Sequence, residues 1–255
     1  MHGLHDAQIP QEIDPDTGLP IGTKVANPAA ARRPERTVLE GRYCRLEPID
    51  PARHADDLFR ASNPPDAARR FRYLFDVVPR TRAILDEWLR VAAASDDPLV
   101  FAVIDKRTGR VEGRQTLMRI TPEHRTIEIG NIYWGPAIAR SVVTTEANYL
   151  FARHVFDDLG YRRYEWKCDA LNAPSRDAAE RFGFTFEGHF RRAVINKGRS
   201  RDTTWFAMID EEWPALKAAY DRWLAPDNFD AQGRQKTSLR DLTRAALVPL
   251  GAAQK

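Results

Sequence analysis

The chain has 255 residues, of which 43% are hydrophobic and 29% charged, as is ordinary for a globular protein with a buried core. No apolar run approaches the roughly 20 residues that a membrane span needs, and the N-terminal stretch lacks the charged start and apolar core of a signal peptide. The net charge of +3 is too small to indicate a nucleic-acid partner. We therefore expect a cytoplasmic protein that binds neither membranes nor nucleic acid.

The cysteines and histidines show no disulfide or metal-ligand pattern. Cys44 and Cys168 lie far apart in the sequence and belong to no CxxC motif, so we expect both to pack as small hydrophobic side chains. The histidines at positions 54, 124, 154 and 189 have no ligand spacing. We predict no metal site.

The composition divides the chain into three regions. Residues 1–38 are rich in Pro, Gly and Asp and lack a hydrophobic period, so we expect an arm that either wraps the domain or is disordered. Residues 39–213 carry the strand and helix patterns of one domain. Residues 214–255 hold a C-terminal helix and a basic tail, which is either solvated or in contact with an acidic partner.

The first half of the domain predicts a strand, two helices and an antiparallel meander. Asp50 precedes Pro51, a pair that is typical of a helix cap and the first helical position. The other predicted elements are a short strand near Cys44, an amphipathic helix over residues 80–95, and strands over residues 99–105, 109–120 and 125–134.

The third strand of this meander contains a change of parity. Ile127 and Ile129 occupy odd positions and Ile132 an even one, so the inward face changes across Gly130 and Asn131. An extra residue there predicts a β-bulge, which would splay this strand from its next neighbour.

The second half predicts a crossover and a late hairpin. A helix over residues 143–159 separates the meander from a strand over residues 162–170, and a right-handed crossover of this length makes the two flanking strands parallel. The remaining elements are a short helix capped by Asn172, a hairpin over residues 184–210 and a terminal helix that includes Trp213. We therefore expect an α/β (α+β) fold whose mixed, mostly antiparallel seven-stranded sheet has a central parallel pair, splayed at the bulge, and helices on both faces.

Two predicted helix N-termini meet beyond the ends of the parallel strands, one after Ile138 and one after Asn172. Each offers unpaired N–H groups to an anion, and ligands of such sheets bind at this edge. The gap at the bulge can receive an extended ligand arm by main-chain pairing. This arrangement suits a phosphorylated cofactor.

The segment NAPSRDAAERFGFTFEG, residues 172–188, resembles the coenzyme A segment of the GCN5-related N-acetyltransferase (GNAT) superfamily, in the branch that includes the ribosomal-protein alanine acetyltransferases. The positions that carry the resemblance are Asn172, Ser175, Gly183, Phe184, Glu187 and Gly188. It extends over roughly Glu40 to Trp213 and implies the GNAT fold and acetyl transfer from acetyl-CoA to an amine.

One motif of the superfamily is altered. Its pyrophosphate loop has Gln or Arg, then Gly, then Gly or Ala, where this chain has Ala139, Val142 and Thr144. A β-carbon at Val142 restricts the approach of the backbone to phosphate, whereas Arg140 and Ser141 offer side-chain donors instead. We expect weaker or altered cofactor binding.

The resemblance also implies roles for individual residues. Ser175 returns a proton to the thiolate or else bonds its own helix end, and Glu128 is the base, if burial raises its pKa, or else faces solvent. The tyrosine that serves as the acid in many members falls on Ala179. The residues assigned to coenzyme A are Asn131 and Ile132, through main-chain N–H groups, with Arg140, Ser141, Val142, Val143, Thr144, Asn172, Ser175 and Arg176.

Three functions fit the sequence. The first is an acetyl-CoA-dependent N-acetyltransferase that acts on a protein N-terminus or a small-molecule amine. The second uses another activated donor, such as a carrier-protein thioester or an aminoacyl ester, which would account for the altered loop. The third is a sensor or interaction module without activity. A homodimer is compatible with the aromatic-rich sheet and terminal helix but is not required by them.

Overall fold

The computed structural model describes residues 9–247, which separate into two units. The first unit ends at Ala30 and contains an antiparallel hairpin of β1 (Gln11–Ile13) and β2 (Pro20–Gly22), with exposed strand residues. Residues 11–22 of the predicted arm therefore form a hairpin of their own. Residues 1–8 of the arm lie outside the described part of the chain.

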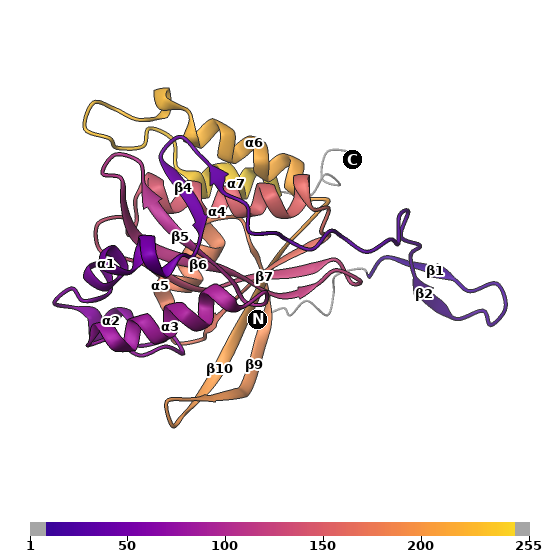
Figure 1. The fold of residues 1–255 in the computed structure, drawn as a ribbon. Coiled ribbons are helices and arrows are strands. Elements are labelled where there is room, and N and C mark those ends of the chain that lie inside the picture. Colours follow the sequence, from indigo (N-terminus) through magenta and orange to yellow (C-terminus); the bar gives the residue numbers. More distant parts are fainter. Residues whose placement is uncertain (1–8, 248–255) are drawn as a thin grey trace. The chain divides into compact units, whose positions relative to one another are not determined.

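The second unit, from Ala31, is built on one mixed sheet (Figure 1). Its strands are β3 (Leu39–Glu40), β4 (Cys44–Pro48), β5 (Leu99–Asp105), β6 (Arg110–Thr121), β7 (Thr126–Trp134), β8 (Arg163–Asp169), β9 (Thr185–Asn196) and β10 (Arg199–Ile209), in the order β3-β4-β5-β6-β7-β8-β10-β9. Every neighbouring pair is antiparallel except β7 and β8. The sheet has eight strands, not the predicted seven, because the two-residue β3 is too short to show an alternating pattern.

Helices cover both faces of the sheet, as predicted. They are α1 (Pro51–Ser62), α2 (Ala67–Arg70), α3 (Arg82–Ala94), α4 (Val142–Arg153), α5 (Ala173–Arg181), α6 (Trp213–Leu224) and α7 (Leu239–Leu247). Leu58 of α1 and Leu89 of α3 pack with Val100 and Ala102 on one face. The helices α4 and α6 belong to the larger core on the other face (Figure 1).

The crossover helix is shorter than predicted. The α-helical part ends at Arg153, and residues 154–158 continue as a wider π-turn in which the N–H of Leu159 donates to the carbonyl of His154 at 3.0 Å. The Nδ1 of His154 also lies 2.8 Å from Oδ2 of Asp158. The apolar stripe alone does not distinguish these two kinds of turn.

Glu146 fixes the start of α4 against the first strands. Its buried carboxylate accepts hydrogen bonds from the N–H groups of Arg42, Tyr43 and Cys44 at 2.6 to 2.8 Å. A carboxylate that accepts several backbone donors replaces the hydration it loses on burial. The helix that borders the functional site is thereby held in place.

Part of the predicted basic tail, up to Leu247, packs against the domain and is not solvated. It forms α7, in which Leu239 and Thr243 are fully buried, and the Thr243 hydroxyl donates to the carbonyl of Arg181 at 3.2 Å. The last eight residues of the sequence, 248–255, lie outside the described residues. The packed part of the tail therefore supports α5 from behind.

The predicted bulge is present and separates the parallel strands. Two residues of β7, Asn131 and Ile132, stand opposite one residue of β6, and Asn131 has a positive φ of 45°. Pairing of β7 with β8 ends at Ile129 and Trp166, although both strands continue. A β-carbon on Gly130 would lie 2.4 Å from the sulfur of Met118, so glycine allows the close approach at this point.

Candidate functional site

A groove of about 1690 Å³ opens where β7 and β8 separate. It is bordered by the N-termini of α4 and α5, by the late hairpin β9–β10 and by the loop between α2 and α3. Four aromatic residues, Tyr133, Trp134, Trp166 and Trp205, line it. The site thus lies at the edge that the parallel strands predict.

The groove is lined from both faces of the sheet. Ile129 and Trp166 are paired and share one face, with Trp166 packed against Phe182 at the end of α5. Glu128 and Lys167 alternate with them and line the groove from the opposite face. The opening between the separated strands β7 and β8 therefore connects the parts of the groove that lie on the two faces of the sheet.

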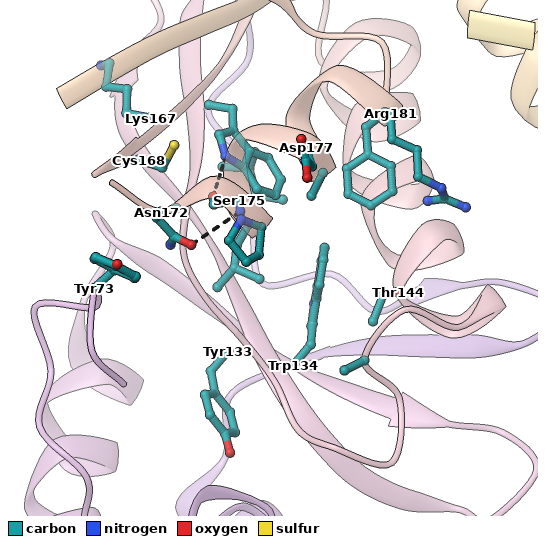
Figure 2. Close-up of a pocket in the computed structure, with 18 of the residues that line it drawn as sticks. Tyr73, Tyr133, Trp134, Thr144, Lys167, Cys168, Asn172, Ser175, Asp177 and Arg181 are labelled. Atoms are coloured by element: carbon teal, nitrogen blue, oxygen red, sulfur yellow. Dashed lines mark hydrogen bonds between the residues drawn. The ribbon is translucent and has the colours of Figure 1, made fainter. Parts of the chain in front are cut away.

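The start of α5 places a serine next to two other groups of the groove (Figure 2). The side-chain oxygen of Asn172 accepts from the N–H of Ser175 at 3.3 Å, as predicted for the cap. The Ser175 Oγ accepts a hydrogen bond of 3.1 Å from the indole of Trp166. Burial raises the pKa of the neighbouring Cys168 thiol, and a contact with Ser175 partly offsets this rise.

Tyr133 is fixed in a structural role. Its hydroxyl donates to the carbonyl of Ala61 at 2.6 Å, and burial raises its pKa to about 12. A phenol that is bonded in this way supplies no proton to the groove.

The start of α4 is a capped helix end without glycine. Ser141 is the N-cap and accepts from the N–H of Val143 at 3.2 Å, and the hydroxyl of Thr144 donates to the carbonyl of Ser141 at 3.0 Å. The hydroxyl proton of Thr144 is thus used within the helix end, whereas Ser141 only accepts there. Val142 is half-buried and lines the groove, and Arg140 is exposed with a φ of 62°.

Arg181 brings a second guanidinium to this region. It extends from the far end of α5 and donates to Oγ1 of Thr145 at 3.0 Å, and its guanidinium also lies against the rings of Phe182 and Trp223. Among the described residues no carboxylate pairs with it, and burial lowers its pKa. Thr144 and Arg181 lie together on one side of Figure 2, across from Asn172 and Ser175. A cation without a carboxylate beside a helix N-terminus suits an anionic ligand.

Glu128 is buried, in contrast to the solvent-facing alternative. Its Oε2 lies 2.8 Å from Nζ of Lys167 and 2.5 Å from Nη1 of Arg119. Lys167 also pairs with Glu165 at 2.7 Å and stands 3.7 Å above the ring of Trp205. The two cations offset the cost of burying the Glu128 carboxylate.

The structure brings most of the predicted site residues to the groove. Those that line it are Glu128, Asn131, Ile132, Arg140, Ser141, Val142, Thr144, Asn172 and Ser175. Two do not line it, because Val143 packs into the core and Arg176 lies outside the groove lining.

The sequence did not point to Lys167, Cys168, Arg181 or Arg201 as site residues, although all four line the groove. Lys167 and Cys168 follow Trp166 on β8, so alternation along a strand that carries the site is the signal that could have marked them. Arg181 and Arg201 reach the groove only through tertiary packing, for which the sequence holds no local signal.

Among residues 9–247, no three His, Cys, Asp or Glu side chains gather in a way that could hold a metal ion. In the same part of the chain, no helix combines the length and apolar character needed to cross a bilayer.

Comparison with known proteins agrees with this geometry. The family model described as acetyltransferase (GNAT) domain matches residues 44–185. The crystal structure of a GCN5-related N-acetyltransferase from Brucella melitensis shares 57% identity, covering 85% of this chain and 98% of that one, with a TM-score of 0.84. A probable GNAT-family acetyltransferase from Chromobacterium violaceum ATCC 12472 shares 34% identity, covering 77% and 98%, with a TM-score of 0.72.

More distant structures share the fold. An acetyltransferase from Salmonella typhimurium, described as modifying the N-terminal serine of 50S ribosomal protein L7/L12, has 16% identity and a TM-score of 0.60, covering 68% of this chain and 99% of that one. A search of curated proteins finds no significant match. The family model and the two more similar structures show that this chain is an enzyme of acetyl transfer and belongs to the GCN5-related N-acetyltransferase family.

Proposed function

We propose that the protein transfers an acetyl group from acetyl-CoA to a primary amine, on a protein N-terminus or a small molecule, by direct attack of the amine. The observation that carries the proposal is the opening between β7 and β8 beyond Ile129 and Trp166, which connects lined regions on both faces of the sheet. In such an arrangement the acetyl donor approaches from the side of α4 and α5. The amine approaches from the side of Glu128 and Lys167.

The residues on the first side fit coenzyme A. The N-terminus of α4 and the carboxylate-free guanidinium of Arg181 suit the phosphates, together with exposed Arg140. The stretch of β7 beyond Ile129 has no pairing with β8 and suits an extended amide-containing arm. Acetyl-CoA supplies a thioester carbonyl that an amine can attack.

The chain itself supplies proton transfer and charge stabilisation. Ser175 accepts from the indole of Trp166, so its own hydroxyl proton can be directed to a departing thiolate. A main-chain N–H at Asn131 or Ile132 on the bulge stabilises the carbonyl oxygen. Glu128, directly or through water, receives the proton of the amine, and Lys167 holds its carboxylate in place.

A different acyl donor is the second candidate, and a specific observation favours it. Val142 takes the place of a glycine in the pyrophosphate loop and lines the groove, while the Thr144 hydroxyl donates to the carbonyl of Ser141. An acyl donor that is a carrier-protein thioester or an aminoacyl ester would make different contacts with the start of α4 than the pyrophosphate of coenzyme A does.

Titration with acetyl-CoA separates the two candidates. Saturable binding by calorimetry, with a rise in melting temperature, supports the proposal because a ligand of the native state stabilises it by mass action. Thiol release with a panel of amines then measures turnover. If millimolar acetyl-CoA neither binds nor raises the melting temperature, and a carrier-linked acyl group is consumed, the second candidate replaces the first.

A further inference from the structure

Strand β10 presents three polar or aromatic side chains to the groove on the amine side. Arg201, Thr203 and Trp205 alternate along the strand and all line the groove. The pairs Thr203 with Asp169 and Trp205 with Lys167 place them on the same face as Glu128. This wall is therefore separate from the α4 and α5 ends that suit coenzyme A.

Two donors on this wall lack acceptors. The Nε of Arg201 and the Nε1 of Trp205 are buried and have no hydrogen-bond partner among the described residues. The guanidinium and the indole can only donate, so each requires an acceptor that the chain does not provide. Buried donors in native proteins are nearly always paired, and an exception inside a groove indicates a ligand.

Arg201 also lacks a carboxylate. Arg201 is only 8% exposed, and it takes part in none of the ion pairs within residues 9–247. Its guanidinium carbon lies 4.7 Å from the ring centroid of Phe75 in the α2–α3 loop. By contrast, Lys167 and Arg119 on the same side are both paired with Glu128.

Burial lowers the pKa of Arg201, which nearby Asp169, Cys168 and Glu128 only partly offset. A bound anion would offset the loss of hydration that burial imposes on the Arg201 guanidinium. A planar guanidinium pairs best with a carboxylate, through two parallel hydrogen bonds.

We propose that the acceptor amine carries a carboxylate, and that Arg201 binds this carboxylate with Trp205 as a second donor. This inference rests on the proposed function, because it assigns a substrate class to the same groove. The carboxylate has two possible sources, a free amino acid or an acidic side chain next to a peptide N-terminus.

Matched substrate pairs test the proposal. For amino acids, glutamine and glutamate α-amide are each compared with glutaminamide, which removes the α-carboxylate or the side-chain carboxylate in turn. For peptides, Ser-Asp-Ala amide is compared with Ser-Asn-Ala amide. The measurement is kcat/KM per unprotonated amine, at saturating acetyl-CoA.

We expect the parent to prefer the carboxylate-bearing member of at least one pair by ~10- to 100-fold, as for a hydrogen-bonded charged group. Arg201→Gln abolishes this preference, Arg201→Lys restores part of it, and Trp205→Phe reduces it by about threefold. The control is Arg199→Gln, an exposed position of the same strand, which retains the full preference. Equal rates within every pair, or an unchanged preference in Arg201→Gln, overturn the proposal.

A binding measurement separates failure of this inference from failure of the proposed function. N-acetylglutamate should raise the melting temperature of the parent and of Arg199→Gln more than Nα-acetylglutaminamide does, and should not do so for Arg201→Gln. If no amine is acetylated but this difference is found, the acetyl-transfer proposal fails and the carboxylate site stands. If N-acetylglutamate gives no greater rise than Nα-acetylglutaminamide, which has neither carboxylate, the carboxylate site is refuted. Trp205→Phe serves in the same assay where Arg201→Gln does not fold.

Discussion

The indole of Trp166 donates to the Oγ of Ser175 at 3.1 Å, while Asn172, and not Ser175, caps α5. The alternative role for Ser175 was a bond to its own helix end. The serine hydroxyl does not make that bond. Since an indole can only donate, it occupies an oxygen lone pair and leaves the hydroxyl proton of Ser175 available.

Ser175→Ala should lower kcat by about 10²-fold, the lower range for loss of a general acid. The measurement is thiol release at saturating acetyl-CoA and amine. Trp166→Phe is the matched variant, because it removes the indole donor but keeps the hydroxyl, and its kcat should fall much less. Equal turnover in Ser175→Ala and the parent would show that the serine is not the acid.

Glu128→Gln should lower kcat/KM for the amine, because an amide accepts no proton. The control is Glu165→Gln, which removes the other carboxylate paired with Lys167. If both variants lose activity equally, Glu128 only positions Lys167.

Local signals explain how much of the site could be predicted. The isoleucine parity around Gly130 marked the bulge, and Asp50 and Asn172 marked helix starts, because a bulge or a cap is set by a few consecutive residues. The end of α4 at Arg153 was missed because α- and π-turns share one apolar stripe.

Contacts between distant segments could not be predicted. Five of the nine residues of α7 are apolar, but only the structure shows that Leu239 and Thr243 pack into the core beside Arg181. Arg201 resembles any other strand arginine in the sequence. Its lack of a partner depends on where the carboxylates of other strands lie, which no local pattern records.

Arg181→Gln should weaken acetyl-CoA binding by about 10- to 100-fold, which is the usual worth of a hydrogen bond to a charged group. The control is Arg222→Gln, at an exposed position of α6. Calorimetry at two salt concentrations provides the measurement, and the parent should lose more affinity with added salt than Arg181→Gln does. Unchanged affinity in the variant would remove Arg181 from the coenzyme site.

Acid stability should depend on Glu165. Burial opposes its ionisation, but Arg163 and Lys167 outweigh this effect, so its pKa lies below the ordinary value of 4.5. A carboxylate with a lowered folded-state pKa stabilises the protein above its unfolded-state pKa, and this contribution is lost as the pH falls through the folded-state value. The parent should therefore melt above Glu165→Gln at pH 6 to 7, and the difference should shrink below about pH 4.5. A difference in melting temperature that is constant over this range would contradict the assignment.

Val142→Gly tests whether the altered loop limits coenzyme binding. The branched side chain of Val142 lines the groove at the first position of α4, so its removal lets a phosphate approach the N–H groups of the helix. We expect a lower Kd for acetyl-CoA and an intermediate value for Val142→Ala, which keeps the β-carbon. Stability should be about 0.5 to 1 kcal/mol lower in the glycine variant than in Val142→Ala through backbone entropy, so affinity and melting temperature should change in opposite senses between these two variants. Weaker binding in both variants would mean that Val142 contributes packing to the site and that the chain does not depend on the usual approach to pyrophosphate.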